Sequence, residues 1–309
     1  MKSFLTLYHR DDWHKENPVQ NLDIRLMYAV WGSIAKQKKF EMYRASYDWF
    51  KDGYFTKAWR YNLRHGYWEK QIGKVRPSVL FDRAISFDKK TGEPDEEVHL
   101  NKVRLAQHIP MINQPEFTWL VDNKAYQAAL FKDVMSPTYF APPGSLITQP
   151  KGKRVVLKAL GGLGGDYVSI IDKQRFMLKD RRIVQHFIDG RVNGQVQDFR
   201  VHFVGDRPQY MYTRVAPPGS YFTNVHLGAS FYWLKPEDAQ EVWDLAQQVV
   251  RRLSMFNRKF FCLDFMINAK TNKPMLIEIN STPGTAEFTV KQHEHLLSSM
   301  SDHLFGWDR

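Results

Sequence analysis

The sequence predicts a mixed α+β fold, and three observations lead to this class. Two segments of the first third, residues 22–35 and 97–108, space their apolar residues as amphipathic helices do. From residue 154 onward, most apolar residues instead fall into short runs or alternating patterns typical of strands. The 309 residues are 43% hydrophobic and 25% charged, which indicates an ordered chain long enough for one large or two modest domains.

The first part of the chain alternates strands and helices. We expect, in order, a strand at 3–8, a helix at 22–35, a strand within 75–87, a helix at 97–108, a short strand at 109–113 and a helix at 125–132. Asp122 or Asn123 stands where the last helix needs an N-cap, because short polar side chains accept hydrogen bonds from the free amides of a helix start.

The later part of the chain is dominated by strands. We expect them at 154–159, 167–171, 183–188, 198–204, 209–215, 260–267 and 275–280. One strong helix interrupts them at 239–253, where Val242, Ala246, Val249 and Leu253 recur at the spacing of one buried face. We expect no second strong helix after residue 154.

Charge and cysteine content narrow the functional classes. Lys and Arg number 44 against 33 Asp and Glu, and the net charge of +11 favours an anionic partner such as a nucleotide, an acidic metabolite or nucleic acid. The single cysteine, Cys262, cannot form a disulfide within the chain, and no run of 18 uncharged apolar residues occurs. We therefore expect a cytoplasmic protein without a membrane partner.

A glycine-rich segment follows the predicted strand that carries Lys158. Its glycines leave backbone amides free to approach an anion closely, and they are Gly161, Gly162, Gly164 and Gly165. Strand-like residues follow, so the segment is neither a P-loop nor a dinucleotide-binding turn, both of which open a helix. It is either an anion-binding loop or a plain hairpin turn.

Two strands in the last sixth of the sequence place carboxylates opposite each other. If they form a hairpin in which Asp264 faces Glu278, then Ile267 faces Met275 across a short loop. Asp264, Glu278 and Asn280 then share one face, because residues two apart point to the same side of a strand. Such oxygen ligands suit Mg²⁺ held jointly with nucleotide phosphates. The alternative is that one carboxylate is exposed and the other caps a turn.

Arginines supply the opposite charge on neighbouring strands. Polar and apolar residues alternate there, so each strand presents three polar side chains on one face, namely Asp198, Arg200 and His202, then Tyr210, Tyr212 and Arg214. Facing arginines opposite a metal would stabilise charge that develops on a phosphoryl group. Taken alone, each arginine is more typical of an exposed surface.

Six motifs in one order resemble the ATP-grasp ligases. They are Asp122-Asn123-Lys124, Lys158 with its glycine loop, residues 185–188, Asp198-Phe199-Arg200, Arg214 followed by Asn224, and Asp264 with residues 278–284. The resemblance is greatest to the branch that contains the ribosomal-protein glutamate ligase and bacterial glutathione synthetase. It covers residues 75–290 and implies an ATP-grasp fold, in which two α+β subdomains clasp ATP, preceded by an α/β domain of the pre-ATP-grasp type.

The resemblance implies a role for each matching residue. ATP would be bound by Lys124, Lys158, Gly161, Gly162, Gly164, Gly165, Gln185, His186, Phe187, Ile188 and Asp189. Two Mg²⁺ ions, or Mn²⁺ in their place, would be bound by Asp264, Glu278 and Asn280. The transferred phosphate and the carboxylate acceptor would be held by Arg200, Arg214 and Asn224.

The same resemblance implies the chemistry of an ATP-dependent carboxylate–amine ligase. A substrate carboxylate attacks the γ-phosphate of ATP to give an acyl phosphate, and an amine then displaces phosphate to form an amide. The implied parts are an N-terminal domain at 1–115, a central lid subdomain at 116–188 and a C-terminal subdomain with the metal site at 189–309. The substrates would be small-molecule or peptide carboxylates and amines, and a homo-oligomer is left open.

Three other functions compete with this hypothesis. A small-molecule kinase of the same fold would use the same metal and phosphate residues, so only its product distinguishes it. A nucleic-acid binder would use the interleaved aromatic and basic residues of 54–76, but aromatic residues of a globular domain usually lie in its core. A catalytically silent nucleotide-binding protein is disfavoured because all three implied metal ligands are present.

Two further candidates are interpreted as structural. Cys262 stands between Phe261 and Leu263 in a predicted strand, so we expect a core residue rather than a nucleophile. His293 and His295 lack a third ligand at metal spacing, so we expect both on a helix surface.

Overall fold

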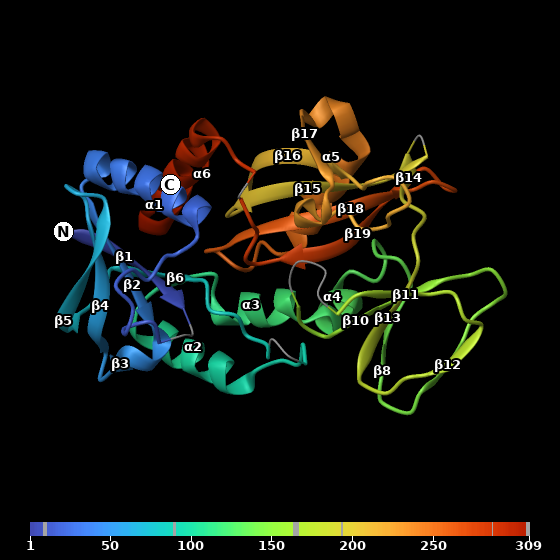
Figure 1. The fold of residues 1–309 in the computed structure, drawn as a ribbon, viewed down its shortest axis with the longest axis horizontal. Coiled ribbons are helices and arrows are strands. Elements are labelled where there is room, and N and C mark those ends of the chain that lie inside the picture. Colours follow the sequence, from blue (N-terminus) through green and yellow to red (C-terminus); the bar gives the residue numbers. More distant parts are fainter. Residues whose placement is uncertain (9–10, 89–90, 163–166, 193, 286, 307–309) are drawn as a thin grey trace.

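The N-terminal part of the chain folds into a seven-stranded sheet at one end of the molecule (Figure 1). The structure is a computed structural model that describes residues 1–8, 11–88, 91–162, 167–192, 194–285 and 287–306. The strand order is β3 (Phe50–Lys51), β4 (Tyr54–Asn62), β2 (Phe40–Ser46), β1 (Lys2–Tyr8), β6 (Val79–Asp82) and β7 (Met111–Ile112), and β5 (Tyr67–Val75) pairs with β4. Strands β2, β1, β6 and β7 run parallel, whereas β4 is antiparallel to each of its partners.

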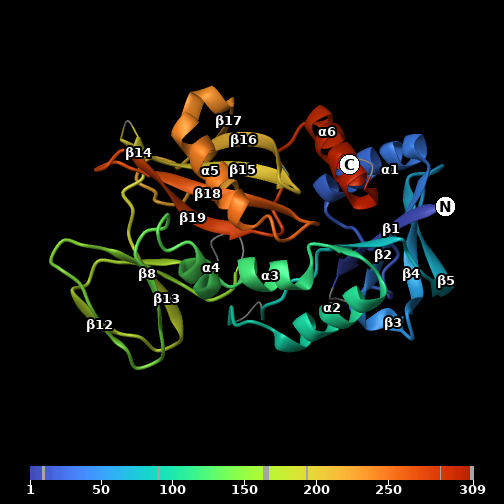
Figure 2. The same ribbon diagram turned by 180° about the vertical axis from the view of Figure 1, so that it is seen from behind.

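Helices cover both faces of this sheet (Figures 1 and 2). α1 (Leu22–Lys38) and α6 (Val290–Phe305) lie side by side on one face, and α2 (Glu96–His108) lies on the other. Trp31 of α1 and Met300 of α6 belong to the same buried core as the central strands. Neither these helices nor any other helix in the described ranges is long and apolar enough to cross a membrane.

The aromatic residues of the predicted basic segment belong mainly to this core. Phe55, Trp59, Tyr61 and Trp68 are buried between the β4–β5 ribbon and its neighbours, and Tyr67 is exposed. The short helix η1 (Tyr47–Trp49) precedes β3 and adds the buried Trp49.

The helix α6 corrects two expectations. It is a second well-formed helix after residue 154, where we expected only one. The sequence pattern did not reveal it, because its few apolar residues are interspersed with His and Ser and are buried by α1 rather than by a neighbour in the sequence. His295 is exposed, as expected, but the surface position expected for His293 is wrong, since only 2% of this residue is exposed where α6 packs beside Phe288.

A smaller antiparallel sheet lies at the opposite end of the molecule (Figure 1). Its strand order is β11 (Ser169–Ile171), β10 (Val155–Lys158), β13 (Arg182–His186) and β8 (Thr138–Ala141), and a separate ribbon pairs β12 (Arg175–Met177) with β9 (Leu146–Thr148). A small core that includes Ile147, Val155 and Val184 holds the two together. This sheet contains the predicted strands that flank the glycine-rich loop.

The third sheet has six strands and two chemically different faces. Its strand order is β17 (Ser230–Leu234), β16 (Arg207–Val215), β15 (Gln195–Val204), β18 (Phe260–Asn268) and β19 (Lys273–Asn280), and β14 (Arg191–Val192) pairs with β15. Residues such as Val201 and Leu263 on one face share a core with α5 (Gln240–Arg252) and α3 (Pro115–Asp122). The opposite face carries the polar residues singled out in the sequence. The short helices η2 (Val225–Leu227) and η3 (Pro236–Ala239) lie in the connections on either side of β17.

The predicted α+β class and the order of the predicted strands and helices are confirmed, and the structure adds elements that were not predicted, among them β2, β4, β5, α3, β8 and α6. The division of the chain at residues 115 and 188 stays a prediction, and the packing adds two facts. α3 and α4 (Lys124–Leu130) precede the small sheet along the chain, yet both pack against β19 of the six-stranded sheet. α6 follows the six-stranded sheet, yet it packs on the N-terminal sheet.

Candidate functional site

A cavity of about 460 Å³ lies between the small sheet and the polar face of the six-stranded sheet. Most of the predicted site residues line it: Lys158, Gln185, His186, Phe187, Ile188, Arg200, Arg214, Asn224, Asp264, Glu278 and Asn280. Its volume lies in the range of about 300 to 1,000 Å³ that is common for small-molecule sites. The cavity has an apolar end between the sheets and a charged end on the six-stranded sheet.

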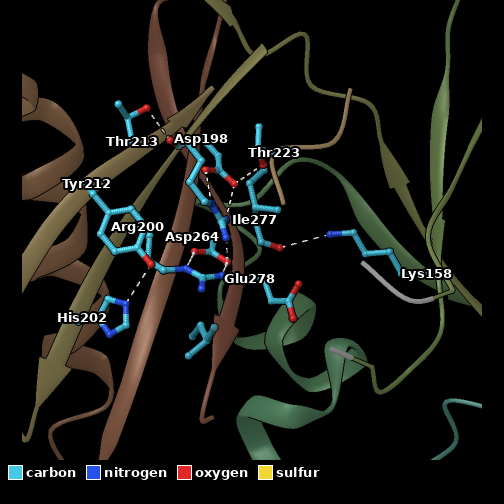
Figure 3. A network of polar contacts seen from close by, with 12 residues as sticks. Lys158, Asp198, Arg200, His202, Tyr212, Thr213, Thr223, Asp264, Ile277 and Glu278 are labelled. Atoms are coloured by element: carbon cyan, nitrogen blue, oxygen red, sulfur yellow. Dashed lines mark hydrogen bonds and ion pairs between the residues drawn. The ribbon is translucent and has the colours of Figure 1, made fainter. Parts of the chain in front are cut away.

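The charged end is built as a row across four adjacent strands (Figure 3). Tyr212 of β16 is opposite Arg200 of β15, Arg200 is opposite Asp264 of β18, and Asp264 is opposite Glu278 of β19. Directly opposed residues of neighbouring strands place their side chains on the same face of the sheet, within contact distance. The predicted register between Asp264 and Glu278 is therefore confirmed.

The register fails beyond this pair, because β19 contains a bulge. Asp264 is opposite Glu278, but the next residue, Phe265, is opposite Leu276, so Ile277 is the extra residue. The predicted pairing of Ile267 with Met275 is wrong, since Ile267 is opposite Pro274. The carbonyl oxygen of Ile277 accepts a 3.5 Å hydrogen bond from Lys158 Nζ across the cavity (Figure 3).

A buried ion pair joins the centre of the row. Arg200 donates from Nε to Asp264 Oδ1 and from Nη2 to Asp264 Oδ2, and both bonds are 2.6 Å long. Burial opposes ionisation of the Asp264 carboxyl, but the charges of Arg200 and Arg214 outweigh it and hold its pKa below the usual value. Asp264 is therefore an anion at neutral pH.

A second buried ion pair joins Asp198 of β15 to Arg214 of β16, and Asp198 lies two residues before Arg200. Arg214 donates from Nε to Asp198 Oδ1 at 2.8 Å and from Nη2 to Asp198 Oδ2 at 2.5 Å, and Thr223 donates its hydroxyl to Asp198 Oδ2 at 2.5 Å. Burial raises the pKa of Asp198, while the Arg214 charge opposes this rise. Nη2 of Arg214 also lies 3.6 Å from Asp264 Oδ2, so the two pairs form one network.

Two lysines approach Glu278 from the other side of the cavity. Lys124 Nζ lies 3.4 Å from Glu278 Oε1 and donates to the carbonyl of Gly162 at 3.3 Å. Lys158 is buried, and burial lowers its pKa to about 8, although the charge of Glu278 works in the opposite direction. Lys124 lies behind the lining residues of the cavity rather than among them.

The described part of the glycine loop is held against the N-terminal domain. The amide of Gly161 donates to the carbonyl of Gly92 at 2.7 Å, and a Cβ at Gly161 would lie 2.7 Å from Phe87. Gly162 has a φ of +144°, a value that favours glycine. The predicted site residues Gly164 and Gly165 lie outside the described residues.

The predicted adenine hinge borders the apolar end of the cavity. The amides of His186 and Phe187 already donate to the carbonyls of Pro137 and Arg154, at 2.9 and 3.1 Å. Gln185 donates its side-chain amide to Thr138 Oγ1 at 3.1 Å. Contacts from these residues to a ligand would therefore come from their remaining polar atoms and from the Phe187 ring.

The structure places Asp189 apart from the other site residues. Its carboxylate accepts two hydrogen bonds from Arg191, at 2.7 and 2.8 Å, and the side chain does not border the cavity. The hydrogen bonds from Arg191 lower the pKa of Asp189, against a smaller effect of burial.

Several lining residues were not recognised in the sequence. They are Tyr221, Phe222 and Thr223 in the connection after β16, Thr282 and Glu287 after β19, and the apolar Val156, Ile170 and Met266. The Arg154 guanidinium lies 4.1 Å from the ring centre of Phe187 and 4.7 Å from that of Tyr221, so it links two of these segments. The aromatic pair Tyr221-Phe222, which lies between two strands, is the signal that could have found this segment, because ligand-binding residues are often carried by loops.

The residues at the charged end fit a divalent cation. Asp264 and Glu278 offer carboxylates on adjacent strands, and Asn280 lies two residues beyond Glu278, with its Oδ1 accepting the Thr282 amide at 2.9 Å. In the described part of the chain, no three His, Cys, Asp or Glu side chains gather as a closed metal site. Two carboxylates with one amide oxygen are the sparse, hard donor set that Mg²⁺ takes when substrate phosphates complete its coordination.

Comparisons with known proteins agree with this geometry. The sequence profile described as RimK-like ATP-grasp domain matches residues 144–300. No curated protein sequence matches significantly.

Three similar solved structures indicate the extent of the fold. A RimK domain ATP-grasp protein from Sphaerobacter thermophilus is 12% identical with a TM-score of 0.57, and the match covers 98% of this chain and 100% of that one. D-cycloserine synthetase DcsG is 12% identical with a TM-score of 0.63, over 97% and 99% of the two chains. The ATP-grasp ligase PsnB, complexed with a minimal precursor, Mg and ADP, is 13% identical with a TM-score of 0.55, over 97% of each chain. At these identities the similarity concerns the fold alone.

Proposed function

Because this chain belongs to the RimK-like ATP-grasp domain family, we propose that it is an ATP-dependent ligase that joins a carboxylate to an amine. The ATP-grasp fold and the family resemblance predicted from the sequence are confirmed. The single observation that carries the proposal is the row of Arg200, Asp264 and Glu278, which faces a nucleotide-sized cavity bordered by Lys158.

We place ATP in this cavity with adenine at the apolar end. Phe187, Tyr221 and Ile188 border that end, and the Arg154 guanidinium holds the two aromatic rings in place. The phosphates would then point to Lys124 and Lys158. With the described residues, both ammonium groups make only long contacts of 3.3 to 3.5 Å, which they can exchange for shorter ones to phosphate oxygens.

The metal ligands in this proposal are Asp264, Glu278 and Asn280. A bound Mg²⁺ ion would neutralise charge on the transferring phosphoryl group, and PsnB was solved with Mg and ADP. Two ions, or Mn²⁺ in their place, are the finer form of this proposal. Arg200 holds the Asp264 carboxylate in one orientation, so this ligand would be aligned before the metal arrives.

The proposed reaction has two steps. A carboxylate oxygen of one substrate attacks the γ-phosphorus of ATP, the bond to the bridging oxygen breaks, and an acyl phosphate and ADP form. The nitrogen of an amine then attacks the acyl carbon, phosphate leaves, and the amine loses a proton as the amide forms. Arg200, Arg214 and Asn224 border the place of reaction, and the two guanidinium groups would stabilise the anionic phosphoryl group.

Each of the three predicted parts would have its own role in this proposal. The N-terminal part at 1–115 would contribute to substrate choice, the part at 116–188 would cover ATP, and the part at 189–309 would supply the metal ligands. Use of ATP and a reduced Cys262 favour a cytoplasmic location. The substrates would be small molecules or peptides, and the oligomeric state is open.

The test uses hydroxylamine as a general amine. Purified protein with Mg-ATP and a panel of carboxylic acids should release ADP and form a hydroxamate with one of the acids, which mass spectrometry identifies. Replacing hydroxylamine by amino acids should give an amide one water lighter than its two parents. A stable phosphorylated product that hydroxylamine does not intercept would instead identify a kinase, and Mg-ATP binding without any transfer would contradict the ligase.

A further inference from the structure

A second cavity, separate from the nucleotide cavity, lies between the N-terminal sheet and α6. Its volume is about 290 Å³, and residues of β1, α1, β6, β18 and α6 contribute to its walls. Gly284 borders both cavities, Thr282 borders the first, and Thr285 borders the second. The two cavities therefore adjoin at the turn formed by residues 282–285. We call the second cavity the switch-point crevice.

The topology of the N-terminal sheet explains why a crevice forms there. From β1 the chain passes through α1 to β2 on one side, whereas β6 and β7 lie on the other side of β1. The order of parallel strands thus reverses between β1 and β6, and open α/β sheets bind ligands outside the carboxyl ends of strands at such a point. Tyr8 is the last residue of β1 and Arg83 directly follows β6, and both border the crevice.

The crevice walls suit a bulky apolar group. Its aromatic rings come from Tyr8, Tyr28, Trp31, Phe81 and Phe260, and its aliphatic side chains include Met27, Leu297 and Met300. The polar atoms of the aromatic walls already have partners, because Tyr8 and Tyr28 share a 2.9 Å hydrogen bond and Trp31 Nε1 donates to Ser301 Oγ at 2.9 Å. What remains for a ligand is a preformed surface of carbon atoms.

Five polar side chains interrupt this apolar surface, namely Asn21, Asp23, Arg83, Thr285 and His293, and two of them could select a ligand. Arg83 forms no ion pair with the described part of the chain, and its side chain is only partly exposed. His293 is 2% exposed, its Nε2 lies 3.3 Å from Thr285 Oγ1, and its buried Nδ1 has no hydrogen-bond partner among the described residues. A buried polar atom of this kind normally has a partner, and a ligand with an N–H group would provide one.

We propose that the switch-point crevice binds the amine substrate of the ligase, and that this substrate is an amino acid with a bulky apolar side chain. The apolar side chain occupies the aromatic walls, the carboxylate pairs with Arg83, and the amine lies beside His293 and Thr285, next to the turn that borders the nucleotide cavity. A ligand carboxylate that pairs with Arg83 lies in the second cavity, away from the nucleotide phosphates. This substrate therefore reacts through its amine. That the bound amino acid is a substrate rests on the proposed ligase function, but its binding can be measured without turnover.

Burial lowers the pKa of His293, so its ring is neutral near pH 7 and keeps one nitrogen as an acceptor. The titratable groups that border the same crevice are Asp23 at its exposed rim, Tyr8, Tyr28 and Arg83. Among these, Arg83 is the only cation, which is why a carboxylate is the group selected.

The test measures binding without turnover, by calorimetry on the full chain with Mg²⁺ and a non-hydrolysable ATP analogue. L-Phenylalanine should bind at least tenfold more tightly than L-alanine, which lacks the apolar group, and than phenethylamine, which lacks the carboxylate. Arg83→Gln should weaken L-phenylalanine about tenfold and leave phenethylamine unchanged. Arg104→Gln, at an exposed arginine of α2, should change neither affinity.

Three outcomes would overturn the proposal. They are equal affinity for L-phenylalanine and L-alanine, no binding of L-phenylalanine at millimolar concentration, and an Arg83→Gln variant that loses both aromatic ligands equally. Ligase failure gives a different pattern, in which L-phenylalanine binds with these preferences but neither ADP nor an amide is formed. Conversely, amide formation with small polar amines, without L-phenylalanine binding, would leave the ligase in place and reject the crevice.

Discussion

The guanidinium of Arg200 meets the carboxylate of Asp264 through two parallel hydrogen bonds of 2.6 Å, while Glu278 faces the same carboxylate from the next strand. One carboxylate thus has a cation on one side and an anion on the other. Two neighbouring carboxylates repel each other, and Arg200 offsets this repulsion for Asp264 but not for Glu278. The cation beside Glu278 is instead Lys124, at the longer distance of 3.4 Å, so Glu278 is the less tightly paired of the two carboxylates and the freer to take a metal ion.

The first prediction concerns Glu278→Gln. This variant keeps the shape of the side chain but loses the charge, so we expect ADP release to fall about 100-fold or more at saturating Mg-ATP. A titration with Mg²⁺ should show a higher concentration at half-maximal rate. Glu294→Gln, at an exposed position of α6, is the matched control and should behave as the unaltered protein. Unchanged activity in Glu278→Gln would remove it from the metal site.

The second prediction concerns the buried pair of Asp198 and Arg214. Asp198→Ala leaves the Arg214 guanidinium buried without its main partner, so we expect the free energy of unfolding to fall by about 3 kcal/mol or more in urea denaturation. Asp198→Asn keeps one acceptor oxygen and should lose less stability. If both variants unfold at the same urea concentration as the unaltered protein, the pair is not a structural support of the site.

The third prediction concerns pH and Lys158. Burial lowers its pKa from 10.5 to about 8, so below pH 8 the folded protein carries a buried charge that the unfolded chain holds in water. Lys158→Met removes this cost, and we expect the unliganded variant to be more stable by about 3 kcal/mol at pH 7. The difference should shrink between pH 8 and 10.5, because both states of the unaltered protein lose the proton across that window.

The same variant should lose affinity for ATP, which separates binding from stability. Thermal or urea unfolding at pH 7 and pH 10, with and without Mg-ATP, measures both effects. A variant that is less stable than the unaltered protein at pH 7 would show that the packing of the lysine chain outweighs the cost of its charge.

The fourth prediction concerns the contact between Gly161 and Phe87. A Cβ at Gly161 would lie 2.7 Å from Phe87, so Gly161→Ala should displace the loop and weaken ATP binding about tenfold. The Cβ and Cγ of Phe87 both lie 2.7 Å from that position, so Phe87→Gly, which removes both atoms, creates the missing space, and the double variant should recover much of the affinity that Gly161→Ala loses. A double-mutant cycle of calorimetric ATP affinities gives this coupling. Additive losses would show that Phe87 does not position the loop.

Much of the fold could be predicted because the strands follow local rules. Side chains two apart share a face, so the row that contains Asp264 and Glu278 follows from the sequence of one hairpin. The bulge at Ile277 could not be predicted in this way, because nothing in the local pattern distinguishes an inserted residue from a regular one. It is the same residue whose carbonyl accepts the hydrogen bond from Lys158, a contact between two sheets.

The parts that the sequence did not reveal depend on distant contacts. The position of His293 is decided by α1 and Phe288, and helical periodicity alone does not say which face another helix will cover. The stack of Arg154, Phe187 and Tyr221 likewise joins three separate segments. The switch-point crevice needs residues from both ends of the chain, so only the assembled fold makes it visible.

The packing of α6 on α1 also has a consequence for folding during synthesis on the ribosome. Trp31 and Ser301 are 270 residues apart, yet their hydrogen bond closes the core of the first sheet, and Lys38 pairs with Asp302 at 2.5 Å beside it. Contacts between such distant residues form slowly, and until α6 has been synthesised one face of the first sheet is covered only in part, by α1. The N-terminal sheet thus emerges before the six-stranded sheet but is completed after it, so nascent chains are expected to need chaperone protection until α6 has been made.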